Sequence, residues 1–467
     1  MRDVYVIGAH TIKFGKYLDT SIKILAQNTF MGSLKDAGLE IKDIEALWFS
    51  NSGWGESGQT AIRGQVALRA IGVNTIPITN VENACASGST AFHHAWASVA
   101  GEHTNIAMAV GAEKIYHTNP VAVFAGFIGG VDVENILTIA AGLTDFQMTD
   151  EDQKQVEAFQ AKYKDDSVKP SSKSKKKKDS LWKKFRDNFV VGIMMGEKLG
   201  YKTIYELNKL GSADHSPFMD IYGYAARQHM KEYGSTIEQL AMVASKSHHN
   251  STLNPNAQYT FEVSIKDVLL DRVVSWPITR SMCAPIGDGA ASAIVCSKEV
   301  VDKLGLQKQA VKVRASILGS GKVDEVDFTQ PSIGERLSKL AYEKAGVGPE
   351  DISFAEVHDA TAFGEICQVE NLGFCPKGEG GIFAETGATK LDGSKPINTS
   401  GGLLSRGHPI GASGLAQIHE LFTQLRGVAG DRQVKNPKLG MAENGGGALG
   451  GEEAAMCMHI FEAPSKK

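Results

Sequence analysis

Two stretches of the 467-residue chain repeat, and this repeat limits the possible fold more than any other feature of the sequence. Residues 37–50 line up with residues 345–358, because both have Ala-Gly, then Asp-Ile, then a run that reads as a strand. Residues 85–91 line up with residues 411–417, which share Ala-Ser-Gly, and each opens a stretch that reads as a helix followed by an apolar strand. The repeat predicts two similar α/β halves in one chain.

Strands and helices alternate at both ends of the chain. The apolar periodicity predicts strands at 3–8, 45–50, 76–80 and 106–113 and helices at 22–37, 61–71 and 87–100. The pattern resumes after residue 270, with strands at 273–278, 287–295 and 354–358 and a helix at 332–345. Such alternation is typical of parallel strands joined by crossover helices.

The middle of the chain differs, because few strand signals occur between residues 116 and 270 and amphipathic helical stretches dominate. We expect four parts: residues 1–115 in the first half, an inserted helical region at 116–270, a return to the first half at 271–310, and the second half at 311–467. The lysine-rich run at 169–178 predicts an exposed loop. An electrostatic role toward an anionic substrate or an acidic partner is the alternative.

Composition narrows the function classes. A net charge of −4 with 42% hydrophobic residues is ordinary for a soluble protein and favours neither nucleic acid nor a membrane surface as partner. The six cysteines show no Cys-x-x-Cys spacing, which argues against a zinc site or a disulfide framework. We expect a cytoplasmic protein, since the sequence shows neither a signal-peptide pattern nor an apolar span of about 18 residues.

Cys85 lies where a strand is expected to meet a helix. The free N–H groups at a helix start stabilise an anion, so we expect a lowered thiol pKa and donors for an oxyanion. The sequence therefore predicts Cys85 as a nucleophile. A buried, apolar cysteine is the alternative interpretation.

Three polar groups of the second half lie at expected strand ends, where α/β folds place ligands. His358 follows one strand, and His408 lies in the glycine-rich loop 401–414 before a helix. Glu443 lies at the edge between a strand and the glycine run 445–447. Glycine lets a backbone approach a ligand closely, so the loop around His408 indicates a catalytic histidine.

Four motifs, taken together and in this order, resemble those of the thiolase superfamily. They are Asn83-Ala-Cys-Ala-Ser-Gly88, His358-Asp359, Gly407-His-Pro-Ile-Gly-Ala-Ser-Gly414 and Gly445-Gly-Gly447. The resemblance spans nearly the whole chain and is nearest to the sterol-carrier-type and archaeal branch. It implies two βαβαβαββ halves in a five-layer α-β-α-β-α sandwich, a loop region inserted in the first half, and a tight dimer.

The resemblance also implies a role for each matching residue. Cys85 becomes acylated, and His408 takes its proton and then helps to hold the thioester oxygen. His358 stands where this branch has a histidine that helps to form an oxyanion hole. The backbone N–H groups of Cys85 and Gly445 form a second hole for the tetrahedral intermediate.

One part of the family pattern is missing. A thiolase needs a second acid/base, commonly a cysteine, and its two usual positions here hold Ala360 and Glu443. Either Glu443 moves the second proton, with a pKa raised by burial, or another group does, or the reaction is not ordinary thiolysis. Glu443 could instead brace the glycine loop. Cys283 is interpreted as structural although it could approach the site, and Cys367 and Cys375 as packed.

The sequence therefore predicts an acyl-CoA C-acyltransferase that cleaves a 3-oxoacyl-CoA with coenzyme A, or runs the reverse Claisen condensation. The large insertion and the missing cysteine suggest an unusual acyl group. The pattern resembles that of thiolases acting on branched or aromatic 3-oxoacyl-CoA, which implies β-oxidation-like steps of aromatic degradation. Coenzyme A is expected as a substrate, with contacts from Ser413 and Gly414, and neither a bound cofactor nor a metal is expected.

Two other functions stay open at this stage. One is a retro-aldolase of the same fold acting on a hydroxyacyl-CoA, and the other is a non-catalytic scaffold that presents acyl-CoA. The branch also implies a homodimer or larger assembly. A small zinc-ribbon and OB-fold protein is a further possible partner.

Overall fold

A computed structural model gives the fold of the chain. It describes residues 1–54, 58–116, 126–131, 148–163, 216, 218–322, 330–449 and 452–464. The lysine-rich run at 169–178 lies outside the described residues, as does about half of the expected insertion at 116–270. In the part of the chain that the structure describes, no helix is both long and apolar enough to span a membrane.

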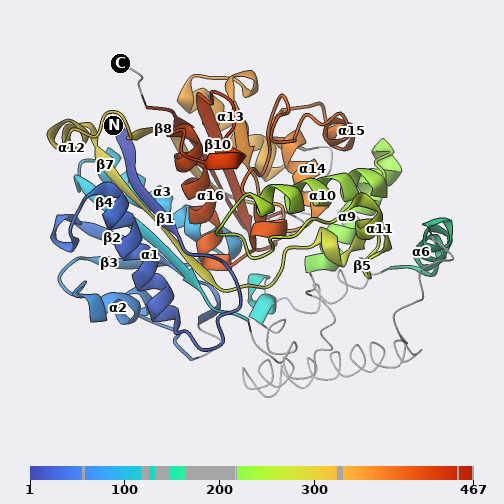
Figure 1. The fold of residues 1–467 in the computed structure, drawn as a ribbon, viewed down its shortest axis with the longest axis horizontal. Helices are drawn as coiled ribbons and strands as arrows, with labels where there is room; N and C mark the ends of the chain where they lie inside the picture. The colour runs from blue at the N-terminus through green and yellow to red at the C-terminus, as the bar shows by residue number, and fades with distance from the viewer. Residues whose placement is uncertain are drawn as a thin grey trace.

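Nine strands form one mixed sheet in the order β3-β2-β4-β7-β1-β8-β11-β10-β9 (Figure 1). The strands are β1 (Val4–Thr11), β2 (Ala46–Ser50), β3 (Ile78–Val81), β4 (Ile106–Glu113), β7 (Gly289–Ser297), β8 (Val311–Ser320), β9 (Phe354–Glu356), β10 (Leu439–Gly446) and β11 (Ala455–Glu462). The expected strands at 3–8, 45–50, 76–80, 106–113, 287–295 and 354–358 are all present within a few residues.

The sheet consists of two similar halves joined in the middle. From the junction outward the first half reads β1-β7-β4-β2-β3 and the second reads β8-β11-β10-β9, with β7 and β11 antiparallel to their neighbours. The junction itself is short, since β1 and β8 pair only through Tyr5–Lys312 and Val6–Val311. The first half ends in the outermost strand β3. At the equivalent place, next to β9, the second half has a single bridge between Ala355 and Ile397.

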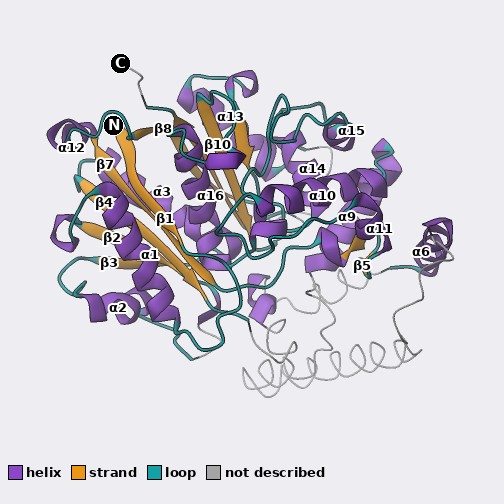
Figure 2. Ribbon diagram, viewed as in Figure 1, coloured by secondary structure: helices purple, strands orange, loops and turns teal. Residues whose placement is uncertain are grey.

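Helices lie on both sides of each half and between them (Figure 2). They are α1 (Ile22–Ala37), α2 (Arg63–Leu68), α3 (Ser87–Ala100), α6 (Asp150–Tyr163), α9 (Phe218–Tyr233), α10 (Ile237–Thr252), α11 (Ile265–Leu270), α12 (Lys298–Leu304), α13 (Ile333–Ala345), α14 (Ala362–Asn371), α15 (Gly380–Glu385) and α16 (Ile410–Leu425). Helix α1 covers the outer face of the first half and α13 that of the second, while α3 and α16 fill the space between the halves. This arrangement is the predicted five-layer sandwich.

The central layer depends on residues without side chains. Helices α3 and α16 begin at the two repeated Ala-Ser-Gly segments, and they cross so closely that a Cβ on Gly414 would lie 2.6 Å from the backbone nitrogen of Ser89. A Cβ on Gly111 of β4 would lie 2.1 Å from the carbonyl oxygen of Gly411. Small residues at these points therefore bring the N-termini of both helices to one place.

The prediction of a core strand at 273–278 is wrong. The segment instead forms a separate two-stranded hairpin of β5 (Val273–Ser275) and β6 (Ile278–Thr279). Trp276 and Pro277 make its turn, and proline has no N–H for a sheet hydrogen bond, so an apolar run alone misled the prediction. The hairpin packs with α9, α10 and α11 around their own hydrophobic cluster.

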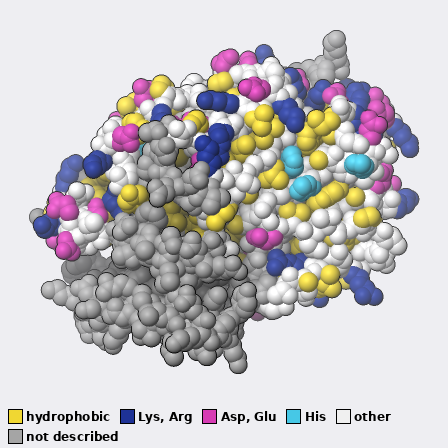
Figure 3. All heavy atoms as spheres, turned by 180° about the vertical axis from the view of Figure 1, so that it is seen from behind, with side chains coloured by type: hydrophobic (Ala, Val, Ile, Leu, Met, Phe, Trp, Pro, Cys, Tyr) yellow, Lys and Arg dark blue, Asp and Glu magenta, His cyan; other side chains and the backbone are white. Residues whose placement is uncertain are grey.

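Figure 3 shows positive and negative side chains mixed over the described part of one face rather than gathered by sign. This distribution agrees with the small net charge of −4.

Candidate active site

Cys85 lies in a tight turn between β3 and α3. The turn spans Ala84–Ala86, and α3 begins at the next residue, as predicted. Ala84 has a φ of 46°, which is rare for a residue with a side chain and indicates local strain. The Ser87 hydroxyl secures the turn, because it accepts the N–H of Asn83 at 2.8 Å and donates to the Ala84 carbonyl at 2.6 Å.

The thiol of Cys85 does not have the lowered pKa that its position predicts. Burial raises its pKa to about 12, and the nearby Glu113 and Glu82 carboxylates add to the rise. The backbone N–H groups of Cys85 and Gly447 act in the opposite direction but are outweighed. Cys85 is therefore a neutral thiol near pH 7 and needs a base to become a nucleophile.

His408 provides that base. Its Nε2 lies 3.2 Å from the Cys85 sulfur, and its Nδ1 lies 2.6 Å from the Ser413 hydroxyl oxygen. Because the Ser413 hydroxyl donates its own hydrogen to the Pro409 carbonyl at 3.0 Å, its oxygen must accept from Nδ1–H. Burial, helped by His358 and Arg406, lowers the pKa of His408 well below its usual range. The imidazole is therefore neutral, with Nε2 free to take the thiol proton.

His358 carries the opposite tautomer. It follows β9, and its Nδ1 lies 3.0 Å from the side-chain nitrogen of Asn444, which donates to it. The ring proton is thus on Nε2, the nitrogen that is available to the cavity lined by His358. Burial lowers the pKa of His358 to about 4, so the ring is a neutral hydrogen-bond donor.

The glycine-rich loop before α16 holds His408 in its position beside Cys85. Gly402 has a φ of 61°, and a Cβ there would lie 2.1 Å from an Asp359 carboxylate oxygen, so only glycine fits. The Asp359 carboxylate accepts the N–H of Leu403 at 2.6 Å. At the helix start, Gly411 donates its N–H to Glu113 of β4 at 3.1 Å, which ties the loop to the half that carries Cys85.

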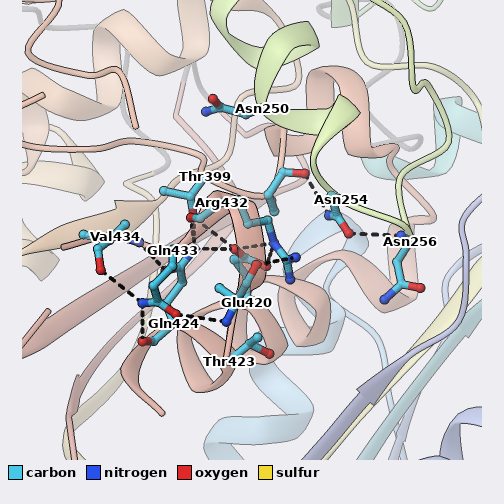
Figure 4. A network of polar contacts seen from close by, with 12 residues as sticks. Asn250, Asn254, Asn256, Thr399, Glu420, Thr423, Gln424, Arg432, Gln433 and Val434 are labelled. Carbon is cyan, nitrogen blue, oxygen red and sulfur yellow. Dashed lines mark hydrogen bonds and ion pairs between the residues drawn. The ribbon is translucent and has the colours of Figure 1, made fainter. Parts of the chain in front are cut away.

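Further along α16, a buried polar network fixes the helix (Figure 4). Glu420 accepts two hydrogen bonds from Arg432 at 3.0 and 3.1 Å, one from Thr399 at 3.1 Å and one from Gln424 at 2.9 Å. A fully partnered carboxylate of this kind holds its neighbours rigidly. The network therefore keeps α16, and His408 at its start, in a fixed position.

The reacting groups open into one cavity of about 530 Å³. Its lining includes Cys85, His358, His408, Gly445 and Ala360. The sulfur of Cys85 and one nitrogen of each histidine lie within 4.8 Å of one another. In the part of the chain that the structure describes, no other cluster of three or more metal-ligating side chains occurs. A thiol, a neutral base and a neutral donor in this geometry suit nucleophilic attack on a carbonyl carbon.

Three predicted site residues lie elsewhere than expected. Glu443 is fully buried within β10, and its Oε2 accepts the N–H of His358 at 2.7 Å. Burial raises the pKa of Glu443 to about 8. The cavity lining does not include Glu443, Ser413 or Gly414, and the expected substrate contacts of Ser413 and Gly414 stay predictions. Ser413 orients His408, and Gly414 lets two helices approach.

The cavity lining also includes residues that were not predicted to act in catalysis. Cys283 lines the cavity but its thiol donates to the Thr279 carbonyl at 3.4 Å, while Cys367 and Cys375 are half-buried and not in the lining. Tyr222 of α9 and Glu453, just before β11, also line the cavity. No spacing rule marks either residue, because one lies in the irregular middle region and the other follows a glycine run.

Family models match both ends of the chain. The model described as thiolase, N-terminal domain, matches residues 4–204, and the model described as thiolase C-terminal domain-like matches residues 321–459. The acetyl-CoA acetyltransferase of Methanothermobacter thermautotrophicus is 33% identical over 465 residues, covering 99% of this chain and 100% of that protein. The chain belongs to the thiolase family. As a member of it, the protein is an acyltransferase with coenzyme A as a substrate.

Two further relatives lie in the predicted branch of the thiolase family. Sterol carrier protein 2 of Rattus norvegicus is 32% identical, covering 96% of this thiolase and 70% of that protein. Benzoylsuccinyl-CoA thiolase subunit BbsB of Thauera aromatica is 30% identical, covering 96% of this chain and 95% of that subunit. The predicted resemblance is therefore confirmed.

Solved structures confirm the fold of this thiolase. The Ltp2-ChsH2(DUF35) aldolase has a TM-score of 0.69 at 18% identity, covering 99% of this chain and 98% of that chain. Human mitochondrial 3-ketoacyl-CoA thiolase has a TM-score of 0.60 at 15% identity, covering 99% of both chains.

Proposed function

We propose that this thiolase cleaves a 3-oxoacyl-CoA with coenzyme A through an acyl group on Cys85, or runs the reverse condensation. One observation carries the proposal: the Cys85 sulfur lies 3.2 Å from the free Nε2 of His408, in the cavity that His358 also lines. Both directions need a thiolate, and both pass through oxyanions.

In the first half-reaction, His408 Nε2 takes the thiol proton of Cys85, and the sulfur attacks the keto carbon of the substrate. The backbone N–H groups of Cys85 and Gly445 are proposed to hold the resulting oxyanion. Gly445 and Cys85 both line the cavity, and Gly446 packs so tightly on the turn that a Cβ would lie 2.8 Å from the nitrogen of Cys85. The glycine run is thus held against the Cys85 turn.

Breaking the carbon–carbon bond leaves the electron pair on the departing acyl-CoA as an enolate. The Nε2–H of His358 is placed to donate to the enolate oxygen, because Asn444 occupies Nδ1. A neutral donor suits this step, since a charged imidazolium would be expensive to bury. The enolate then takes a proton at carbon, and coenzyme A releases the acyl group from Cys85.

The acyl group is proposed to be branched or aromatic. The name of the relative from Thauera aromatica, a benzoylsuccinyl-CoA thiolase subunit, supports this class. The lack of a cysteine at both usual second positions supports an unusual substrate as well. We therefore propose a role in a β-oxidation-like route of aromatic degradation.

A retro-aldolase is the second candidate, favoured by the likeness to an aldolase of the same fold. An aldolase does not need an acylated cysteine, whereas here the Cys85–His408 pair is intact. A scaffold that only presents acyl-CoA would not need the two opposite histidine tautomers.

The substrate class can be tested with three probes: acetoacetyl-CoA, an aromatic 3-oxoacyl-CoA such as benzoylsuccinyl-CoA, and a 3-hydroxyacyl-CoA. We expect cleavage of a 3-oxoacyl-CoA only when coenzyme A is added, with the aromatic probe preferred. Cleavage of the hydroxyacyl-CoA without coenzyme A would support the aldolase instead.

The assembly and the partners stay predictions. We propose a homodimer or larger assembly in the cytoplasm, since thiolases often form oligomers. A small zinc-ribbon and OB-fold partner is supported by the two-component name of the aldolase structure. The division of the chain at residues 115, 270 and 310 also stays a prediction.

A further inference from the structure

Two acidic side chains line the cavity, Glu82 and Glu453, and neither is the predicted Glu443. Glu453 lies just before β11 and lines the cavity together with Cys85, His358 and Gly445. A Cβ on Gly445 would lie 2.9 Å from Cγ of Glu453 and 3.4 Å from its Oε1. The missing side chain at Gly445 therefore leaves room for the Glu453 side chain beside the glycine run.

Glu443 and Glu453 differ in what they face. Glu443 is absent from the lining, and one of its oxygens is held by the N–H of His358. A base must reach the proton that it removes, either directly or through one water. Glu443 thus supports His358 from behind, whereas Glu453 faces the space that substrate would occupy.

The Glu453 carboxyl group is also free to exchange a proton. Among the described residues, no lysine, arginine or histidine forms an ion pair with it, and the neighbouring Glu452 is engaged with Arg336. Burial is the main cause of a raised pKa for Glu453, and Glu452 adds to it. A raised pKa lets a carboxyl group both accept and return a proton near neutral pH.

Glu82 already accepts the N–H of Ala84 at 2.6 Å and the hydroxyl of Ser52 at 3.1 Å. Cys283 is a further candidate in the lining, and it is also less suitable. Its thiol donates to the Thr279 carbonyl at 3.4 Å, and burial raises its pKa to about 12. It lies beside Ala360, since the next residue, Ala284, donates its N–H to the Ala360 carbonyl at 2.9 Å. The cysteine is thus near one usual position of the second acid/base but remains a bound, neutral thiol.

We propose that Glu453 is the second catalytic acid/base of this thiolase, an inference that rests on the proposed function. In condensation, a carboxylate oxygen takes a proton from the α-carbon of the second acyl-CoA, and the C–H electron pair becomes the enolate held by His358 Nε2–H. The enolate carbon then attacks the acyl carbon on Cys85, so that a carbon–carbon bond forms, the carbon–sulfur bond breaks and the thiolate returns. In cleavage, the protonated Glu453 delivers the proton to the enolate carbon.

The test separates two reactions of acetyl-CoA: acetylation of Cys85, read by denaturing mass spectrometry, and deuterium uptake at the methyl carbon in D₂O. We expect Glu453→Gln to acetylate Cys85 within a few-fold of the wild type but to lose deuterium uptake by about 100-fold or more. Glu453→Asp should regain part of it. The matched control Glu452→Gln should keep uptake.

Uptake at the wild-type rate in Glu453→Gln would overturn the proposal. Equal loss of acetylation and uptake in Glu453→Gln would also overturn it, because that pattern indicates a structural role. A wild-type enzyme that acetylates Cys85 but takes up no deuterium would contradict any second base here. Absence of any acyl group on Cys85 in the wild type, with acetyl-CoA and with the aromatic 3-oxoacyl-CoA alike, would instead refute the proposed function.

Discussion

Ser413 should set the protonation of His408 rather than bind substrate. Replacing Ser413 by alanine leaves the buried Nδ1–H of His408 without its acceptor at 2.6 Å. An unpaired buried donor costs about 1–3 kcal/mol, and each 1.36 kcal/mol on a barrier corresponds to about tenfold in rate. We therefore expect Ser413→Ala to slow acylation of Cys85 by about 5- to 150-fold, because the imidazole can shift its proton to Nε2 and lose its function as a base.

The assay is the rate of acetyl-Cys85 formation from acetyl-CoA, measured by rapid quenching and mass spectrometry over a range of acetyl-CoA concentrations. Because Ser413 is not in the cavity lining, the half-saturating concentration should stay within about twofold of the wild type while the maximal rate falls. Ser338→Ala is a matched control, since that buried hydroxyl bonds only to the backbone of Glu335 and Asn371. A raised half-saturating concentration with an unchanged maximal rate would show that the reasoning is wrong.

Three further results are expected. Gly446→Ala places a Cβ 2.3 Å from the nitrogen of Ala86, which should displace the Cys85 turn. The free energy of unfolding in urea should fall by about 1–3 kcal/mol. Gly15→Ala is the control and should leave it unchanged, because its new Cβ meets only Tyr17 at 3.9 Å. Alkylation of Cys85 by iodoacetamide should rise about tenfold per pH unit from pH 7 to 9, because the thiol pKa is raised to about 12; a plateau below pH 7 would contradict this. The pKa of Glu443 is raised to about 8, so the folded state binds an extra proton and loses stability as pH rises toward 8. Glu443→Gln should therefore raise the melting midpoint more at pH 8.5 than at pH 5, and an equal effect at both would refute the assignment.

The positions of Cys85 and His408 could be predicted because local sequence determines them. A short strand, a tight turn and a run of small residues fix where the helix after Cys85 begins, and the glycines around His408 fix its loop. The repeat then placed the two helix starts opposite each other, since equivalent elements of a duplicated fold occupy equivalent places. The two helix starts do lie close together, because Gly414 and Gly111 have no side chains at the points of contact.

The electrostatics and the second acid could not be predicted in the same way. The Cys85 pKa depends on burial by segments far away in the sequence, which outweighs the helix start. All eight residues of β10 are buried, so alternation along the strand cannot tell which way Glu443 points. Glu453 enters the cavity only because Gly445 on the neighbouring strand lacks a side chain.

The most direct test of the account is the covalent state of Cys85 during turnover. Wild-type enzyme mixed with acetoacetyl-CoA and quenched in acid should carry one acetyl group on Cys85, and Cys85→Ala should show neither the adduct nor cleavage. The predicted result follows from the thiol lying 3.2 Å from a neutral, unprotonated imidazole nitrogen. Cleavage that continues in Cys85→Ala would contradict the central claim that this thiolase acts through an acyl-cysteine.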